Sequence, residues 1–255
     1  MTDAWLRDMA GDLKIAVQFS TRLPVAAPPA EGADIARSAW AMPIVGALVG
    51  LIGALAYYFA HSAGLPPLPA AVLALAATIV TTGCLHEDGL ADAADGLGGG
   101  TTPEQKLAIM RDPRVGTYGA CALIVSALLR AGAIASLATP ALVTPALIAA
   151  HAAGRAMMPV AMSLVPPART DGLSASAGLV SRKGAMSAGV LGLLAMLLAL
   201  GVTASVVVAM LLLLAIAGVA RVCVRQIGGQ TGDVLGAIEQ VGEIIVLLAA
   251  AAARP

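Results

Sequence analysis

The chain has 255 residues, of which 59% are hydrophobic and only 12% are charged, with a mean hydropathy of +0.89 and a formal net charge of zero. Soluble globular proteins carry about 25% charged residues, so this composition excludes an ordinary soluble domain and indicates an integral membrane protein. The zero net charge, with no basic run and no aromatic platform, gives no basis for nucleic-acid binding.

The N-terminal segment, residues 1–38, begins with apolar residues at roughly helical spacing and charges between them. This pattern predicts an amphipathic helix in the membrane interface, ending before Pro24. Apolar runs that are long enough to span a bilayer then predict about seven spans. They lie near residues 40–60, 69–85, 117–138, 141–163, 185–201, 203–220 and 234–252. We therefore expect an all-α, polytopic transmembrane helical bundle that forms one integral-membrane catalytic domain, residues 1–255.

The first span contains a stripe of small residues, Gly46, Gly50 and Gly53, which predicts close helix packing. The distribution of basic residues predicts the orientation of the bundle. With a cytoplasmic N-terminus, the outward connections contain no Lys or Arg: 61–69, 138–141 and 201–204. Of the 15 Lys and Arg residues, all but three fall in the inner segments, the exceptions being Arg130, Arg155 and Arg254. This positive-inside pattern places the N-terminus and the polar connections in the cytoplasm.

Two of these inner connections contain candidate functional residues, namely 86–114 and the glycine-rich loop 221–233. The first begins with the stretch His86–Gly96, which holds four of the 15 acidic residues. In a helix, Asp88, Asp92 and Asp95 would share one face, because they stand at i, i+4 and i+7. Carboxylates at such short distances repel one another, and a bound hard divalent cation such as Mg²⁺ commonly compensates this repulsion. The alternative is an acidic, solvated loop at the membrane surface.

A helix capped by Thr102 and starting at Pro103 is expected next. It leads to Arg111, Asp112 and Arg114, and two arginines in this arrangement suit phosphate oxygens. The alternative is a basic loop that contacts the membrane.

In the second connection, Gly229 and Thr231 belong to a turn whose backbone N–H groups can bind an anion, and Asp233 is a further candidate metal ligand. A glycine-rich helix start is weak evidence by itself. Arg155, within a span, requires an ion pair or a functional role. Glu239 and Glu243 are candidate ion-pair partners of Arg155, and equally of Arg130.

Five segments together closely resemble the cobalamin synthase family: Phe19–Val25, Pro43–Gly46, His86–Gly96, Ile109–Gly119 and Gly228–Ala237. They occur in the family's order and cover essentially the whole length. The one departure is Glu87, where the family pattern has an apolar residue. This glutamate either adds a ligand or faces solvent.

The resemblance implies a Mg²⁺-dependent enzyme of the bacterial inner membrane, active in nucleotide-loop assembly during cobalamin (vitamin B12) biosynthesis. It would join adenosylcobinamide-GDP to α-ribazole, or to its 5′-phosphate, and release GMP. The metal ligands would be Asp88, Asp92, Asp95 and Asp233. Binding of the diphosphate would fall to Arg111, Asp112, Arg114, Gly229 and Thr231. Catalysis would involve Asp88, Asp92 and His86, with Glu87, Arg155 and Glu239 supporting them. Because His86 lies about 160° from Asp88 on a helix, it would have to precede the helix to join them.

Two other classes stay open at this stage. A CDP-alcohol phosphotransferase also places several aspartates on a membrane helix, but Asp92 stands where its motif has an arginine. A cation transporter is the other alternative, although no internal repeat supports it. The lipid bilayer is one expected partner. The glycine-rich spans suit packing within one chain or between chains, so a homo-oligomer also stays open.

Overall fold

The computed structural model describes residues 2–26, 32–177 and 179–253; Arg254 lies outside the described residues. Over these ranges every regular element is helical, and the only bridge between extended segments pairs Pro167 with Gln230. The all-α prediction is confirmed. In chain order the elements are α1 (Thr2–Ser20), α2 (Gly32–Ser38), the 3₁₀ helix η1 (Ala39–Ala41), α3 (Met42–Ser62), α4 (Pro67–Thr82), α5 (Leu85–Gly99), α6 (Pro103–Ile109), α7 (Thr117–Leu137), α8 (Pro140–Leu164), α9 (Leu173–Ala177), α10 (Arg182–Ile227) and α11 (Gly232–Ala252).

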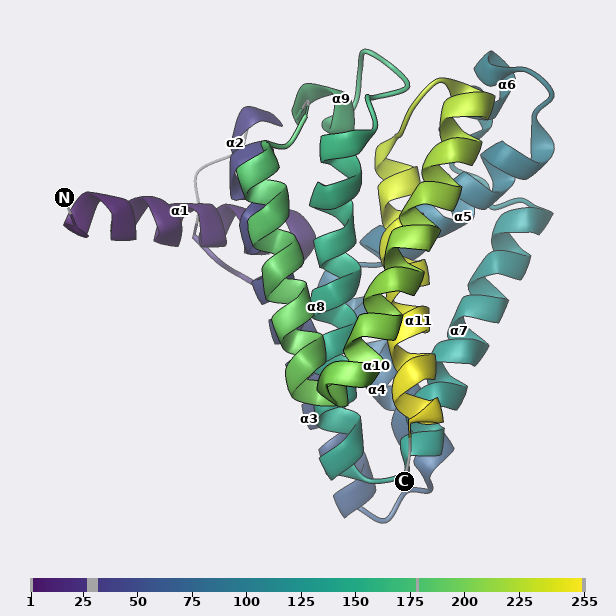
Figure 1. The fold of residues 1–255 in the computed structure, drawn as a ribbon. Coiled ribbons are helices and arrows are strands. Elements are labelled where there is room, and N and C mark those ends of the chain that lie inside the picture. The colour runs from purple at the N-terminus through teal and green to yellow at the C-terminus, as the bar shows by residue number, and fades with distance from the viewer. Residues whose placement is uncertain (1, 27–31, 178, 254–255) are drawn as a thin grey trace.

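Five described helical stretches are long and apolar enough to cross a membrane, and the bent pair α4–α5 brings the number to six. Helix α10 contains 46 residues and would measure about 69 Å if straight, more than twice the thickness of the hydrocarbon core. It is interrupted at Gly201, whose φ of 74° is not helical, and the chain turns back there (Figure 1). Counting the two arms of α10 separately gives the seven passes that the sequence predicts.

The second predicted span does not continue as far as residue 85. Helix α4 ends at Thr82, because Gly83 and Cys84 both adopt left-handed conformations with φ of 65° and 62°. Helix α5 then starts at an angle of 89° to α4. It runs across the bundle beside the start of α7 in Figure 1. We therefore assign α4 to the membrane-crossing part and α5, with its four acidic residues, to the end of the bundle.

The two ends of the bundle differ in their connections. Helices α6 and α9 lie at one end, together with the start of the first arm of α10 and the end of the second (Figure 1). The opposite end carries only short turns after α3 and α7, the bend at Gly201 and the end of α11. The polar connections therefore share one end, as the alternation of spans predicts.

Helix α1 extends sideways from the bundle (Figure 1). It is attached through Asp12, whose carboxylate accepts hydrogen bonds from Arg37 Nε at 2.8 Å and from Trp40 Nε1 at 3.0 Å. The predicted N-terminal helix is thus present. Its position in the membrane interface stays a prediction.

The glycine stripe of α3 allows this helix to pack closely against its neighbours. A Cβ atom added at Gly46 would lie 2.2 Å from the carbonyl oxygen of His151 in α8, and one at Gly50 would lie 2.5 Å from that of Leu147. These neighbours are backbone atoms, so they cannot rotate away. Gly53 faces α4 instead, where Thr78 is the nearest neighbour. The prediction of close packing is confirmed.

We expect Gly46→Ala to destabilise the protein by about 1–3 kcal/mol, because the added methyl group forces α3 away from α8. Thermal unfolding in detergent, followed by size-exclusion chromatography, measures the effect. The matched control is Gly132→Ala in α7, where an added Cβ meets no atom within 4 Å. That change should be neutral or slightly stabilising, since alanine is the better helix former. Equal unfolding temperatures for Gly46→Ala and the wild type would contradict the expectation.

Candidate active site

Helices α5 and α11 touch backbone to backbone at the centre of the candidate site. A Cβ atom added at Gly89 would lie 2.9 Å from the carbonyl oxygen of Asp233, and one at Gly236 would lie 3.2 Å from the Cα of Gly89. Any larger residue at either position would separate the helices. The contact brings the part of α5 that carries Asp88 and Asp92 close to the first turn of α11, which carries Asp233. That these three aspartates bind one metal stays a prediction, because among the described residues their carboxylates do not form a group with ligand atoms within 4.8 Å of one another.

The charges at this contact repel one another. Burial, followed by the negative charges of Asp88, Asp233 and Asp95, raises the pKa of the Asp92 carboxyl to about 6, although Arg169 opposes the shift. Asp92 is therefore harder to ionise than an exposed aspartate, and its protonated form predominates only below about pH 6. A divalent cation between these carboxylates would remove the repulsion, because it offers two positive charges to oxygen ligands.

Asp233 is fixed by two donors. The Thr231 hydroxyl donates to Asp233 Oδ2 at 3.1 Å while its oxygen accepts from Val234 N, which caps α11. Arg169 Nη2 also donates to Asp233 Oδ2, at 3.1 Å. Arg169 Nη1 is buried and has no protein partner in the described part of the chain. This arginine, absent from the residues predicted to bind phosphate, is the one beside the acids.

The segment that carries Arg169 is held by backbone pairing. Ala168 N donates to Gln230 O at 2.8 Å, and Gln230 N donates to Pro166 O at 2.9 Å. Gly229 makes this approach feasible, since a Cβ there would lie 2.3 Å from Pro166 O. Gly229 thus allows the two loops to pair closely. The sequence instead predicts that it contacts phosphate directly. The sequence places both loops on one face but contains no pattern that pairs them.

Asp95 has a different role from the one its spacing suggests. Its two carboxylate oxygens accept hydrogen bonds from the backbone N–H groups of Gly116, at 2.7 Å, and Gly119, at 2.9 Å. Free N–H groups at a helix start need acceptors, and Asp95 supplies them for α7 from a neighbouring helix. It lines a separate cavity with Asp112, Arg114 and Tyr118. The structure therefore separates Asp95 from the cavity beside Asp88 and Asp233.

The two arginines predicted for the diphosphate also separate. Arg114 is exposed and forms two hydrogen bonds with Asp112, at 2.9 and 2.6 Å, which lower the pKa of that carboxyl to about 2. Both residues lie on the Asp95 side. Arg111 instead pairs with Asp171, which lines a cavity of about 170 Å³ together with Arg169 and Asp233. Only Arg111 of the two therefore lies near the edge of the candidate site.

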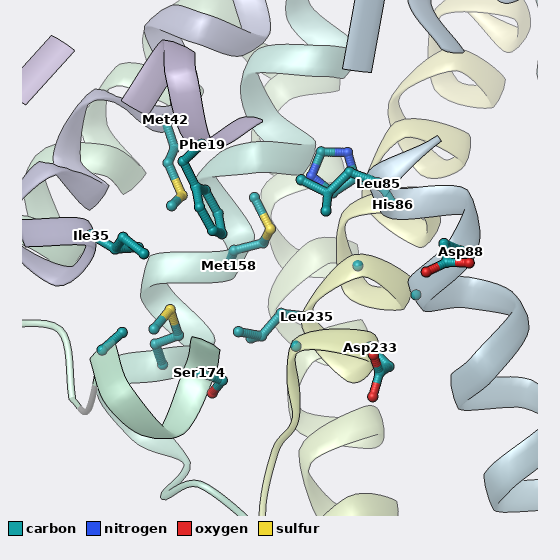
Figure 2. A pocket seen from close by; sticks show the side chains of 15 residues that line it. Phe19, Ile35, Met42, Leu85, His86, Asp88, Met158, Ser174, Asp233 and Leu235 are labelled. Carbon is teal, nitrogen blue, oxygen red and sulfur yellow. The ribbon is translucent and has the colours of Figure 1, made fainter. Parts of the chain in front are cut away.

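A cavity of about 270 Å³ lies next to the acids. Figure 2 shows Asp88 and Asp233 on one side of it, and Phe19, Ile35 and Met42 on the other. Gly232 and Ser174 line both this cavity and the smaller one that contains Arg169. The acids, the arginine and an apolar recess are thus contiguous, which is the arrangement expected of a site for a substrate with charged and apolar parts.

His86 lines the same cavity, although it does not precede the helix. It is the second residue of α5 and is buried, with 3% of its surface exposed. Its Nδ1 lies 3.4 Å from Arg155 Nη2 and 3.7 Å from Glu239 Oε1. Helical His86 thus faces the bundle interior and not the carboxylate of Asp88, in line with its expected position on the helix, although both residues line the cavity.

A network of buried charges continues from His86 into the bundle. Arg155 Nη1 lies 2.7 Å from Glu239 Oε1 and 3.1 Å from Glu243 Oε1. Arg130 Nη1 lies 3.1 Å from both Glu87 Oε1 and Glu243 Oε2. Glu87 therefore neither faces solvent nor joins the acids, because its charge is matched by Arg130. Helices α5, α7, α8 and α11 each contribute to this network.

His151, Glu239 and Glu243 form a group whose potential ligand atoms lie within 4.8 Å of one another. His151 and Glu243 are themselves paired. Arg155 contacts all three residues and already supplies the positive charge that a metal ion would bring. We interpret this group as part of the ion-pair network.

We expect Arg155→Met to lower the unfolding free energy by about 3–5 kcal/mol, because it leaves Glu239 and Glu243 with one fewer buried counter-charge. The measurement is thermal unfolding of the purified protein in detergent. Arg114→Met serves as the control, since Arg114 is exposed, and should unfold like the wild type. If Arg155→Met also unfolds at the wild-type temperature, the network does not stabilise the bundle.

Comparisons with known proteins agree with the motifs. The family model described as cobalamin-5-phosphate synthase matches residues 12–251. The chain is 58% identical to the adenosylcobinamide-GDP ribazoletransferase of Bradyrhizobium diazoefficiens, over 97% of this chain and 95% of that protein. Proteins of the same name from Mesorhizobium japonicum and Azorhizobium caulinodans are 49% and 45% identical, over 97% and 93% of this chain and 95% and 94% of theirs. No solved structure matches the chain.

Proposed function

Because the chain belongs to the cobalamin-5-phosphate synthase family, we propose how its site performs the reaction for which its relatives are named. The enzyme joins adenosylcobinamide-GDP to α-ribazole in cobalamin synthesis. The sequence identities also decide against a CDP-alcohol phosphotransferase and a cation transporter. The single observation that supports the proposed mechanism is the backbone contact of α5, which carries Asp88 and Asp92, with the start of α11, where Asp233 pairs with Arg169.

In this reaction a ribose hydroxyl of α-ribazole, or of its 5′-phosphate, attacks the phosphorus that is joined to cobinamide. A new P–O bond forms, the P–O bond to the GMP phosphate breaks, and GMP leaves with that electron pair. The hydroxyl proton passes to a base at the site. Such transfers require mainly positioning and compensation of negative charge.

Asp88, Asp92 and Asp233 would supply the hard oxygen ligands that Mg²⁺ prefers, from two helices that meet at Gly89 and Gly236. When bound, Mg²⁺ would neutralise charge on the diphosphate. We assign three ligands where the sequence predicts four, because both oxygens of Asp95 hold the start of α7.

Arg169 and Arg111 are the candidates for binding the diphosphate. Arg169 has one buried terminal nitrogen without a protein partner and lies beside the acids, so it can donate to a phosphate oxygen. Arg111 lies further out, on Asp171. His86 and Asp88 line the cavity, and either can accept the hydroxyl proton.

We further infer that the enzyme lies in the bacterial inner membrane with its N-terminus and site on the cytoplasmic side. The polar end of the bundle in Figure 1 carries the acids and most basic residues, which is the positive-inside distribution. Adenosylcobinamide-GDP would then reach the site from the cytoplasm.

We expect Asp92→Asn to lower turnover by about 100-fold or more, because loss of a metal ligand removes several kcal/mol of charge stabilisation. The assay is GMP release from adenosylcobinamide-GDP, with and without α-ribazole and Mg²⁺. Glu104→Gln changes an exposed acid on α6 and should behave as the wild type. Near-normal turnover of Asp92→Asn in correctly inserted protein would remove Asp92 from the metal site.

Arg169→Met should raise the KM for adenosylcobinamide-GDP by about 10-fold or more, because it removes a charge-assisted hydrogen bond to phosphate. The matched variant is Arg114→Met, which also removes an arginine paired with an aspartate but lies on the Asp95 side. Its KM should stay within about twofold of the wild type. The reverse order of effects would mean that Arg114 contacts the diphosphate.

A further inference from the structure

Four polar side chains line the 270 Å³ cavity beside the acids: His86, Asp88, Ser174 and Asp233. Asp88 and Asp233 lie on one side of it in Figure 2, and Ser174 lies apart from them. The rest of the wall is apolar, and its main side chains come from five separate elements: Phe19, Ile35, Met42, Met158, Met162 and Leu235. Methionine side chains are polarisable and adapt to flat ring systems, so this wall suits a small aromatic group.

The two substrates offer different groups to such a cavity. A corrin ring is too large for it, since a volume of 270 Å³ lies just below the range of about 300–1,000 Å³ that is typical of pockets for drug-sized ligands. Guanine has several donors and acceptors that an apolar wall would leave without partners. The benzimidazole base of α-ribazole carries two methyl groups and one free ring nitrogen, so its burial costs little. Of these three ring systems, it matches the cavity best.

The position of Asp88 and Asp233 then orients the acceptor. A ribose attached to the base would extend from the apolar wall towards Asp88 and Asp233, where its hydroxyl groups meet polar partners (Figure 2). This is the place at which the proposed function requires a ribose hydroxyl to approach the diphosphate. The geometry of the cavity and the direction of the reaction therefore agree.

We propose that the cavity between α1, α2, α3, α8 and α11 binds the dimethylbenzimidazole base of the α-ribazole acceptor, with the ribose towards Asp88 and Asp233. This inference rests on the proposed function and adds the subsite for the acceptor. It also gives the N-terminal segment a role, because Phe19 and Ile35 form the wall opposite the acids. The acceptor site is thus partly built by the amphipathic segment outside the bundle.

The first test uses the full-length wild-type enzyme in lipid nanodiscs. Free 5,6-dimethylbenzimidazole should inhibit GMP release in competition with α-ribazole and not with adenosylcobinamide-GDP. Competition with adenosylcobinamide-GDP would overturn the proposal. Absence of inhibition would also overturn it, and would fit a cavity filled by a lipid acyl chain.

The second test fills the cavity. Ala177 lines it, so Ala177→Phe should raise the KM for α-ribazole at least about 10-fold and leave the KM for adenosylcobinamide-GDP within about twofold. Ala195→Phe makes the same change in an apolar groove between α3, α8 and α10 and should leave both constants unchanged. An unchanged KM for α-ribazole in Ala177→Phe overturns the proposal.

Direct binding separates this inference from the proposed function. Calorimetric titration with 5,6-dimethylbenzimidazole needs no turnover, and Ala177→Phe should weaken the binding at least about 10-fold relative to Ala195→Phe. Wild-type enzyme that binds the base but releases no GMP with both substrates and Mg²⁺ would contradict the proposed function alone. Normal GMP release with no binding of the base would contradict the subsite alone.

Discussion

The contact between Gly89 and Gly236 is the constraint on which the site depends. Helices that meet backbone to backbone place the part of α5 that carries Asp88 and Asp92 beside the start of α11, and the charges of Asp88 and Asp233 raise the pKa of Asp92. Such a concentration of negative charge is unfavourable by itself, and it persists because the helices on either side fix both backbones. The same repulsion makes the position attractive for a cation and, through it, for a diphosphate. The close packing of small residues therefore also creates the chemical properties of the site.

The network of buried charges fixes how α5 and α11 are rotated relative to each other at that contact. Glu87 on α5 and Glu243 on α11 share the guanidinium of Arg130, while Arg155 joins Glu243 to Glu239 and approaches His86. Unpaired ions are costly inside an apolar bundle, so a rotation of any one of these helices would be penalised. We interpret the network as a device that fixes helix rotation next to the site. Glu87, the departure from the family pattern, is accommodated because Arg130 lies opposite.

Some local features follow from neighbouring residues alone. Thr102 caps α6 in the predicted way: its hydroxyl oxygen accepts from Gln105 N, and Thr102 N in turn donates to Gln105 Oε1, because both partners lie within one turn. The break at Gly83 and Cys84 was harder to foresee, since only one of the two left-handed residues is a glycine. Asp95 shares its spacing with two candidate ligands, yet it caps α7. Its partners, the N–H groups of Gly116 and Gly119, belong to another helix, so the residues next to Asp95 in the sequence do not indicate this contact.

The sequence by itself determined the membrane bundle, the succession of its spans and the clustering of acids at one end. A bilayer imposes a length and an apolar composition on each span, and both can be read along the chain. It also indicated the family, through motifs that are continuous in sequence. Tertiary structure decided which polar groups meet: Arg169 beside Asp233, Arg114 away from it, and His86 at the cavity. These outcomes depend on helix rotation and on loops paired through backbone atoms, which have no residue-specific pattern in the sequence.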